Sequence, residues 1–402
     1  MTQEAKKYKQ TEIGLIPEDW EVEKISNFAS ISTGGSDTQD RISEGKYPFY
    51  VRSEKVERIN RFSFNGEALL TSGDGVGVGK IFHYVNGKFD YHQRVYNIHN
   101  FNNEVSGKYL FYQFSTNFYD RVMSMTAKSS VDSVRREMIS EMKIPLPPLS
   151  EQKAIATALS DVDALLLSLD KQIAKKKAIK QGAMQELLTP PNLGGKRLPG
   201  FDGEWERVNL NDVCWYQEGP GLRNWQFTDK GIKVINITNL VNGYLNLEKT
   251  QRFISIEEFN LMYKHFEIDE MDIVVASSGN SYCKTSIVRK QDLPLVMNTS
   301  VIRFKPKAGI TYNLLLIFLK SSLFKDQIDL LITGGAQPNF GPVHLKKIKL
   351  NLPQTIEEQS RIAQILSDMD LEIASLEAKR QKYVSIKQGM MQELLTGRTR
   401  LV

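Results

Sequence analysis

A glycine-rich segment at residues 73–80, with the sequence GDGVGVGK, has the composition of a loop that could wrap around a phosphate group. A nucleotide-binding P-loop requires a glycine six residues before its lysine and a hydroxyl side chain directly after that lysine. Asp74 stands at the glycine position, Ile81 stands at the hydroxyl position, and the dinucleotide spacing GxGxxG is not matched either. The segment therefore does not predict a nucleotide site. Two interpretations stay equally open: close approach of the backbone to another group, or a bulged hairpin.

Metal and thiol chemistry have no better support in the sequence. The two cysteines, Cys214 and Cys283, cannot build a disulfide framework, which fits a reducing cytoplasm. No pair of histidines lies at metal-ligand spacing with cysteine or acid neighbours; the five histidines are His83, His92, His99, His265 and His344. We therefore expect no metal, no cofactor and no catalytic residue. The polar start of the chain and its short apolar runs predict a soluble cytoplasmic protein without a signal peptide or membrane span.

The chain contains one long segment twice. Residues 151–189 and 358–396 align without a gap, are identical at about half of their positions, and end in IKQGAMQELLT and IKQGMMQELLT. A weaker repeat precedes each copy, because Trp20 follows Ile16-Pro17 and Trp205 follows Leu198-Pro199, each before a glycine-containing polar loop. Prolines and glycines at residues 190–195 separate the two halves. The sequence thus predicts two similar halves, each a globular domain followed by a long helix.

The repeated segment has the spacing of a coiled coil, with apolar positions alternating by three and four. These positions are Ile155, Leu159, Val162, Leu166, Leu169 and Ile173 in the first copy, and Ile362, Leu366, Met369, Ile373, Leu376, Arg380 and Tyr383 in the second. Some 38 residues of helix would make a rod of roughly 55–60 Å. Two such helices in one chain pair most simply with each other, and the intervening domain makes that pairing antiparallel. The alternative is that each helix belongs to the core of its own domain.

The segments between the helices predict mixed domains. Short buried strands are expected at residues 68–70, 232–237, 272–275 and 301–304, and aromatic-rich helices at residues 109–119 and 312–324. The glycine segment at 73–80 is replaced in the second half by SGNSYCK at 278–284. The two domains share an order of elements but differ in their loops, and the helices that follow them are nearly duplicated. This combination is typical of a scaffold that carries two different recognition domains.

These motifs make the chain resemble the specificity subunits of type I restriction-modification systems. The resemblance covers nearly the whole chain and depends on three features: TEIG followed by IPEDW at residues 11–20, IPLPPLSEQ at residues 144–152, and the two helix ends. The second lead-in, at residues 350–353, has one proline where the first has three. No Asn-Pro-Pro-aromatic or Asp-Pro-Pro-Tyr tetrad is present, which is consistent with a chain that does not itself transfer methyl groups.

The resemblance implies an architecture and a set of partners. The fold class would be α+β, with two mixed target-recognition domains separated and joined by two long helices that form an antiparallel coiled coil in a pseudo-twofold repeat. The domains would occupy residues 1–148 and 191–356, the first helix residues 149–190, and the second helix with a C-terminal tail residues 357–402. Each domain would read one half of a split site in double-stranded DNA. The helices would set the spacer and dock two methyltransferase subunits and, through them, restriction subunits.

Candidate DNA-binding residues come from loops at matching places in the repeat, because base and phosphate contacts use arginine, lysine, amides and hydroxyls. In the first domain they are Gly35, Ser36, Arg52, Ser53, Ser72, Asp74, Lys80, His92, Gln93, Arg94, Lys128 and Ser129. In the second they are Arg223, Thr238, Asn239, Ser278, Asn280, Lys284, Asn298, Thr299, Gln337 and Asn339. The strongest candidates are Arg52 and Arg94 in the first domain and Asn239, Lys284 and Gln337 in the second. Each also has an ordinary role as a turn former or surface group.

Two other classes of protein remain as alternatives. One is a self-contained methyltransferase or nuclease, which the missing nucleotide and metal motifs disfavour. The other is a coiled-coil scaffold without a DNA role. The formal net charge of +5 permits nucleic-acid binding but does not argue for it alone. Salt-sensitive, sequence-specific DNA binding by an assembled complex would exclude the scaffold.

Overall fold

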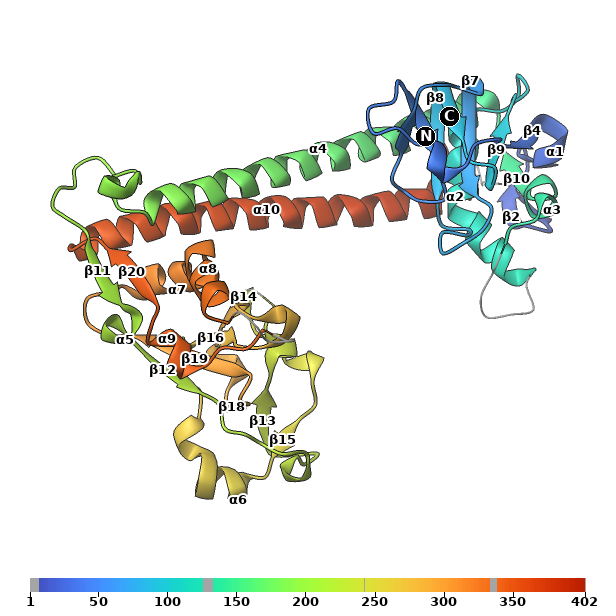
Figure 1. Ribbon diagram of the computed structural model, residues 1–402. Helices are drawn as coiled ribbons and strands as arrows, with labels where there is room; N and C mark the ends of the chain where they lie inside the picture. Colours follow the sequence, from blue (N-terminus) through green and yellow to red (C-terminus); the bar gives the residue numbers. More distant parts are fainter. Residues whose placement is uncertain (1–6, 126–132, 242, 333–337, 402) are drawn as a thin grey trace, which may run out of the picture. The chain divides into compact units, whose positions relative to one another are not determined.

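The protein, seen in a computed structural model, is described here for residues 7–125, 133–241, 243–332 and 338–401. These residues form two compact units, coloured along the chain in Figure 1. The first unit combines Met1–Lys171 with Ala378–Val402, and the second is Gln172–Glu377. Two helices of 39 residues, α4 (Leu149–Leu187) and α10 (Ile356–Leu394), each begin in one unit and end in the other.

The first unit is built on a six-stranded sheet with the strand order β4-β9-β7-β8-β5-β6. Its strands are β4 (Ser30–Thr33), β5 (Tyr47–Tyr50), β6 (Glu57–Ile59), β7 (Phe64–Ser72), β8 (Phe82–Tyr91) and β9 (Val95–His99). Neighbours are antiparallel except β5 and β8, which are parallel. Successive side chains of a strand point to opposite faces. Leu69 therefore enters the core beneath the helices, whereas Ala68 and Leu70 enter a smaller cluster on the other face.

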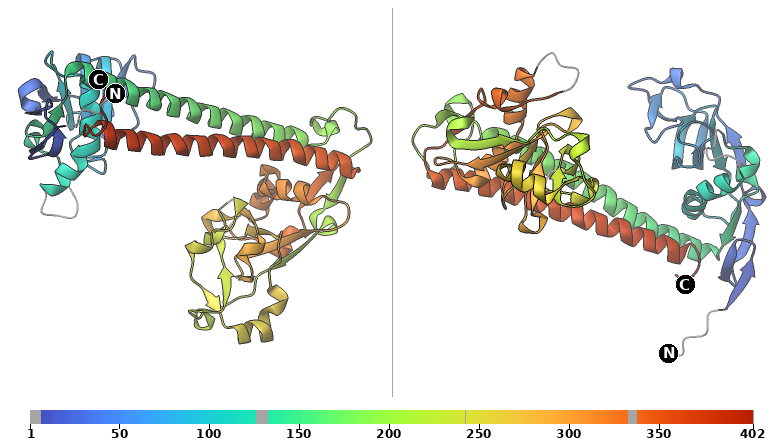
Figure 2. Two further views of the ribbon diagram at one scale, coloured as in Figure 1. Left: turned by 180° about the vertical axis from the view of Figure 1, so that it is seen from behind. Right: turned by 90° about the horizontal axis from the view of Figure 1, so that it is seen from below.

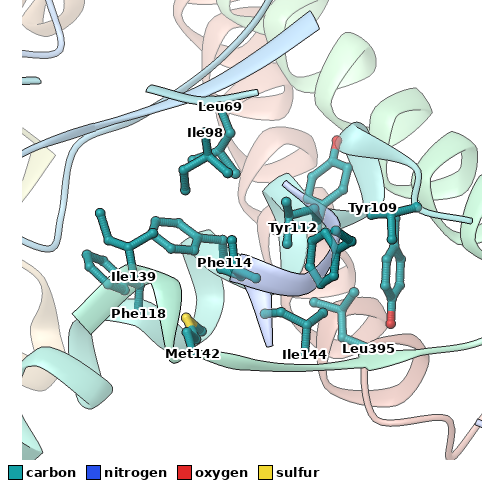
Figure 3. Packing of buried hydrophobic residues seen from close by; sticks show 14 of the residues in the cluster. Leu69, Ile98, Tyr109, Tyr112, Phe114, Phe118, Ile139, Met142, Ile144 and Leu395 are labelled. Atoms are coloured by element: carbon teal, nitrogen blue, oxygen red, sulfur yellow. The ribbon is translucent and has the colours of Figure 1, made fainter. Parts of the chain in front are cut away.

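Helix α2 (Gly107–Ser124) covers this sheet, and Ser106 caps it by accepting a hydrogen bond from the Tyr109 amide. Phe114 and Phe118, four residues apart on one helix face, stack with ring centroids 4.2 Å apart. Figure 3 shows Leu69 and Ile98 of the sheet directed toward these aromatic rings. The unit is completed by β1 (Tyr8–Thr11), β2 (Gly14–Pro17), β3 (Glu21–Lys24), α1 (Ile25–Phe28), α3 (Arg136–Ser140) and β10 (Lys143–Leu146).

The second unit repeats this topology. Its main sheet has the order β12-β19-β16-β17-β14, in which β12, β19, β16 and β17 take the places of β4, β9, β7 and β8, and a smaller sheet has the order β15-β13-β18. Its elements are β11 (Glu206–Asn209), α5 (Leu210–Val213), β12 (Cys214–Glu218), β13 (Ile232–Ile235), β14 (Gly243–Tyr244), β15 (Phe253–Ile254), α6 (Ile256–Glu258), β16 (Ile273–Ala276), β17 (Thr285–Ile287), β18 (Leu295–Met297), β19 (Val301–Pro306), α9 (Pro342–Leu345) and β20 (Lys349–Leu352). The expected mixed domains are confirmed.

One expected helix is divided. The sequence predicted a single helix over residues 312–324, but the structure contains α7 (Tyr312–Lys320) and α8 (Ser322–Leu331). Ser321 separates them, because it takes an extended backbone conformation and its hydroxyl accepts a hydrogen bond from the Phe324 amide as the N-cap of α8. The capping preference of serine ends one helix and begins the next, although the apolar pattern continues through it.

The long helices pair antiparallel within each unit, and Figure 2 shows them side by side from two directions. In the first unit Asp163 of α4 pairs with Lys387 of α10 at 2.6 Å. Asp170 lies one heptad after Asp163, and it pairs at 2.5 Å with Arg380, which lies one heptad before Lys387. In the second unit the lysine-rich part of α4 faces carboxylates of α10, through the pairs Lys176–Glu372, Lys177–Glu377 and Lys180–Asp370. The lysine run at this end of α4 therefore serves helix pairing.

The two interpretations of the long helices, as a coiled coil and as core helices of the domains, each apply to a different part of their length. Ile155 and Leu159, near the start of α4, lie in the core of the first unit, and Leu187 at its end lies in the core of the second. Conversely, Ile362 belongs to the core of the second unit and Leu394 to that of the first. The helix ends are therefore core elements of the domains, while the middle stretches pack on each other.

A polar cluster joins each long helix to its domain, and the two clusters match residue for residue. At the start of α4 the buried Glu151 carboxylate accepts from Nε1 of Trp20 at 3.2 Å and from Arg400 at 2.7 Å. At the start of α10 the buried Glu358 accepts from Nε1 of Trp205 at 3.4 Å and from Arg197 at 2.8 Å.

The residue after each of these glutamates completes the junction. Gln152 accepts from the Ser106 amide and donates to the carbonyls of Glu104 and Pro147, all at 2.9 Å. Gln359 makes the same three bonds in the second unit, with the Thr311 amide and the carbonyls of Gly309 and Pro353. The sequence repeat Glu-Gln thus corresponds to a repeated set of buried hydrogen bonds.

Candidate nucleic-acid interface

The predicted loops of the first unit converge because backbone hydrogen bonds join them at the ends of the sheet strands. The Gln93 amide donates to the Ser36 carbonyl at 2.9 Å, and the His92 amide donates to the Tyr50 carbonyl at 2.9 Å, two residues before Arg52. The Gly73 amide donates to the Arg94 carbonyl at 2.7 Å. Four separate stretches of sequence therefore form one surface.

Two arginines and one aspartate occupy this surface. Nη1 of Arg52 lies 2.8 Å from one carboxylate oxygen of Asp74, and Nη1 of Arg94 lies 3.7 Å from the other. The arginine side chains are 44% and 65% exposed, and the aspartate side chain is 20% exposed. Both guanidinium groups can therefore reach a ligand in solvent, while the carboxylate is less exposed than either of them. Gln93 adds an exposed amide that donates to Asp37 at 2.9 Å.

Other predicted residues of this unit are buried and give the loops their shape. The Ser36 hydroxyl donates to Asp90 at 2.7 Å, and the Ser72 hydroxyl donates to the Asp74 carbonyl at 2.8 Å. The Arg94 amide donates to Nδ1 of the buried His92 at 2.9 Å. Burial lowers the pKa of His92, and the nearby Arg52 charge adds to that effect. A neutral imidazole is the form that can accept this hydrogen bond.

Three further candidates of the first unit are described: Lys80, Ser53 and Gly35. Nζ of the exposed Lys80 lies 5.0 Å from the ring centroid of Tyr119, and the Ser53 hydroxyl donates to the Lys55 carbonyl. Gly35 is exposed. Lys128 and Ser129 lie outside the described residues.

The glycine segment connects β7 to β8, which pair from Thr71 with Phe82 onward. A strand, β8, follows it instead of the helix that a P-loop requires, so the segment is not a P-loop. Gly75 and Gly79 have positive φ, as turns in a hairpin connection need. Gly73 also permits close approach, because a Cβ there would lie 2.8 Å from the Arg94 carbonyl oxygen. Gly73 therefore fits the close-approach interpretation, and the segment connects a hairpin whose strands pair in a regular register from Phe64 to Thr71.

The second unit forms the equivalent surface from equivalent hydrogen bonds. The Asn298 amide donates to the Ile235 carbonyl, and the Ser277 amide donates to the Ser300 carbonyl, both at 2.9 Å. Ser278 and Asn339 form a bridge where Asp74 and Ser133 form one in the first unit. By this correspondence Ile237, Ser278 and Ser300 take the places of Arg52, Asp74 and Arg94. At these three positions the second surface therefore carries an isoleucine and two serines in place of the charged trio.

The predicted residues of the second unit differ in exposure. The exposed ones are Arg223, Thr238, Asn280, Lys284, Thr299 and Asn339, while Ser278 and Asn298 are half-buried. Asn239 is fully buried, and its side chain donates to the Asn246 carbonyl and accepts from the Asn236 amide and the Thr250 hydroxyl. These three bonds occupy its amide group within the loop. Gln337 lies outside the described residues.

Sequence reasoning missed two residues on these surfaces. Arg61 donates to Ser36 at 3.0 Å and to Asp40 at 2.9 Å with its side chain 60% exposed, although it lies on none of the predicted loops. Trp225 follows the candidate Arg223 by two residues and is 80% exposed. Exposure of so large an apolar side chain is unusual and is not visible in sequence, because an isolated tryptophan predicts burial.

The described residues contain no group of three or more histidine, cysteine, aspartate or glutamate side chains placed to hold a metal ion. None of the helices within them is long and apolar enough to cross a membrane. Two structurally equivalent mixed domains with different polar loops, on a pair of long antiparallel helices, define a DNA-specificity type of architecture.

Comparison with known proteins agrees. The family model "Type I restriction modification DNA specificity domain" matches residues 17–181 and 202–385, and the chain belongs to this family. It is 30% identical to the type I restriction enzyme MjaVIII specificity subunit of Methanocaldococcus jannaschii over 406 residues, covering 96% of this chain and 94% of that protein.

Solved structures share the fold. A type I restriction-modification S subunit from M. genitalium matches with a TM-score of 0.63 at 17% identity, covering 93% of this chain and 96% of that one. A chain from a structure describing complex assembly and conformational transition of the type I R-M system matches with a TM-score of 0.59 at 12% identity, covering 96% and 99%. The predicted resemblance and fold class are confirmed.

Proposed function

We propose that this chain is the DNA-reading subunit of a type I restriction-modification complex and that each unit reads one half of a split DNA site. It works in the cytoplasm and contributes no catalytic step. Methyl transfer and DNA cleavage belong to partner subunits. The exposed candidates in each unit make the base and phosphate contacts, and the buried candidates, such as Ser36 and Asn239, hold the loops in place.

One observation carries this proposal. The same backbone hydrogen bonds assemble a loop surface in both units, but the side chains at matching positions differ, as Arg94 and Ser300 do. Arginine suits bidentate contact with guanine, while asparagine, serine and threonine suit other base edges. One scaffold that presents two different sets of polar groups fits two different half-sites.

The long helices supply the remaining functions in this proposal. Their pairing sets the number of unread base pairs between the half-sites. Because the helix ends are duplicated in sequence and in their buried contacts, they offer two similar docking positions, one for each of two methyltransferase subunits. Restriction subunits join through those methyltransferase subunits. Mass measurement of the purified complex tests the stoichiometry, since a complex with a single methyltransferase subunit contradicts two equivalent positions.

The main experiment co-expresses this chain with the methyltransferase subunit of its own system in a host that lacks DNA methylation. Modified adenines are then mapped across the host genome. A split motif with a fixed spacer is the expected result. A continuous motif, or no motif from a soluble and assembled complex, contradicts two readers and favours the scaffold alternative. Methyl transfer by the isolated chain with S-adenosylmethionine would instead support the enzyme alternative.

Single substitutions assign the half-sites. Arg94→Ala should weaken recognition at the first half-site only, by about 5- to 150-fold, which corresponds to the loss of one bidentate base contact. Asn280→Ala should act at the second half-site only. Arg207, exposed on β11 and outside the loops, is the matched control, because Arg207→Ala removes the same charge as Arg94→Ala. Unchanged recognition of the first half-site by the Arg94 variant refutes its assignment.

A further inference from the structure

The charged trio of the first unit contains a residue whose charge opposes DNA binding. Asp74 contacts Arg52 at 2.8 Å and Arg94 at 3.7 Å. These arginines come from different loops, so the carboxylate is the point at which the loops carrying them meet. The trio carries a formal net charge of one, instead of the two charges that the arginines alone would present.

The second unit lacks all three charged residues of the trio together. At the positions of Arg52, Asp74 and Arg94 it has Ile237, Ser278 and Ser300, none of which is charged. The carboxylate is therefore absent where the arginines are absent. The polypeptide fold at this place does not need an aspartate, because the Ser278–Asn339 bridge repeats the backbone pairing of Asp74 with Ser133.

An exposed arginine binds the phosphates of any DNA, and such contacts carry no sequence information. A carboxylate within ion-pair distance repels a phosphate and competes for the same N–H donors. Guanine O6 and N7 are uncharged acceptors, so the carboxylate opposes contact with them far less. Each guanidinium has five N–H donors, which leaves donors free for a base while one contacts Asp74.

We propose that Asp74 is a specificity residue that keeps Arg52 and Arg94 from binding phosphates of non-cognate DNA and positions them for base contact. This inference rests on the proposed function of the first unit as a DNA reader. It adds that the discrimination of this half-site depends on a negative charge, as well as on the arginines that contact DNA.

The test uses the complex with its methyltransferase subunits, a duplex containing the mapped site, and a duplex in which the first half-site is scrambled. Binding of both is measured over a series of salt concentrations. Asp74→Ala and Asp74→Asn should both bind the scrambled duplex more tightly. The slope of log affinity against log salt should steepen by about 1 to 2, because one or two additional phosphate contacts form. Discrimination between the duplexes should fall by about tenfold or more.

The asparagine variant separates charge from position, because it keeps an oxygen that can accept from Arg52. Glu141→Ala is the matched control: it removes the same charge from the same unit, where Glu141 pairs with Lys24 at 2.5 Å. That control should leave discrimination unchanged. Asp74 variants that bind the scrambled duplex no more tightly than the unaltered chain overturn the proposal, as does an effect equal to that of Glu141→Ala. Failure of the proposed function is distinguishable, because the unaltered complex would then yield no split motif.

Discussion

Replacing Arg400 with alanine would leave two carboxylates without their main partner. In the intact chain the Arg400 guanidinium donates to both oxygens of Glu151, at 2.7 and 2.8 Å, and to both oxygens of Asp19, at 2.8 and 2.6 Å. These bonds lower the pKa of Asp19 and raise that of Arg400. The Glu151 side chain has no exposed surface, so its charge would remain buried with Trp20 and the Leu401 amide as polar contacts.

The size of the effect follows from this burial. Removing one partner of a buried ion pair costs about 3–5 kcal/mol, since an uncompensated charge stays in the interior. The Arg400 side chain is 18% exposed, so the lower end of that range, about 3 kcal/mol, is expected. For a unit of this size each kcal/mol lowers the melting temperature by about 2–4 °C, which gives about 6–12 °C.

Hydrogen exchange read peptide by peptide assigns the loss to one unit. Arg400→Ala should speed exchange around Trp20 and the start of α4 by about a hundredfold, whereas Arg197→Ala should do so around Trp205 and the start of α10. Arg380→Ala is the control, because it removes an arginine whose pair with Asp170 is exposed. A melting temperature within 2 °C of the unaltered chain for Arg400→Ala, or exchange that rises equally in both units, would refute the reasoning.

Three further predictions concern the reading surface and the helices. Gly34→Ala should abolish discrimination at the first half-site, because its Cβ would lie 1.9 Å from the Tyr91 carbonyl oxygen, while Gly35→Ala, whose Cβ meets nothing within 4 Å, should leave the loop conformation unchanged. The His92 pKa is lowered on folding, so its contribution to loop stability is present above about pH 6.5 and is lost as pH falls below that value. Binding profiles against pH should therefore show weaker reading of the first half-site in acid, with no such change at the second, where Asn298 replaces it. Inserting four residues into both long helices, about 6 Å of rise, should widen the mapped spacer by roughly two base pairs, and an unchanged spacer would refute the helices as its determinant.

The features that occur in both halves of the chain were the ones best predicted from the sequence. Duplicated segments predicted both long helices, and the apolar spacing identified Ile155 and Ile362 as buried positions, although they lie in the domain cores and not in the seam between the helices. The reading loops could also be located, because they occupy matching places in the two halves. An internal repeat can be recognised in a single sequence because the two halves can be aligned with each other.

Burial within the loops could not be predicted in the same way. Ser36, His92 and Asn239 have the composition of surface groups, but the folded chain buries all three. The partner of Ser36 is Asp90, 54 residues away, whereas Asn239 bonds residues of its own loop. Arg197 and Arg400 follow the long helices in polar segments that resemble ordinary tails. Their importance comes from buried glutamates more than 150 residues away in sequence. No local pattern encodes such a contact.

The matched junctions have a consequence for how such genes can change. Trp20 with Glu151, and Trp205 with Glu358, enclose each globular domain between a fixed beginning and a fixed end, and the backbone carbonyls that Gln152 and Gln359 bind impose little on side-chain identity. A recombination event with breakpoints at these residues would exchange a whole domain as a cassette and keep the tryptophan–glutamate contact at each junction. The reading surface could then be replaced in one genetic step.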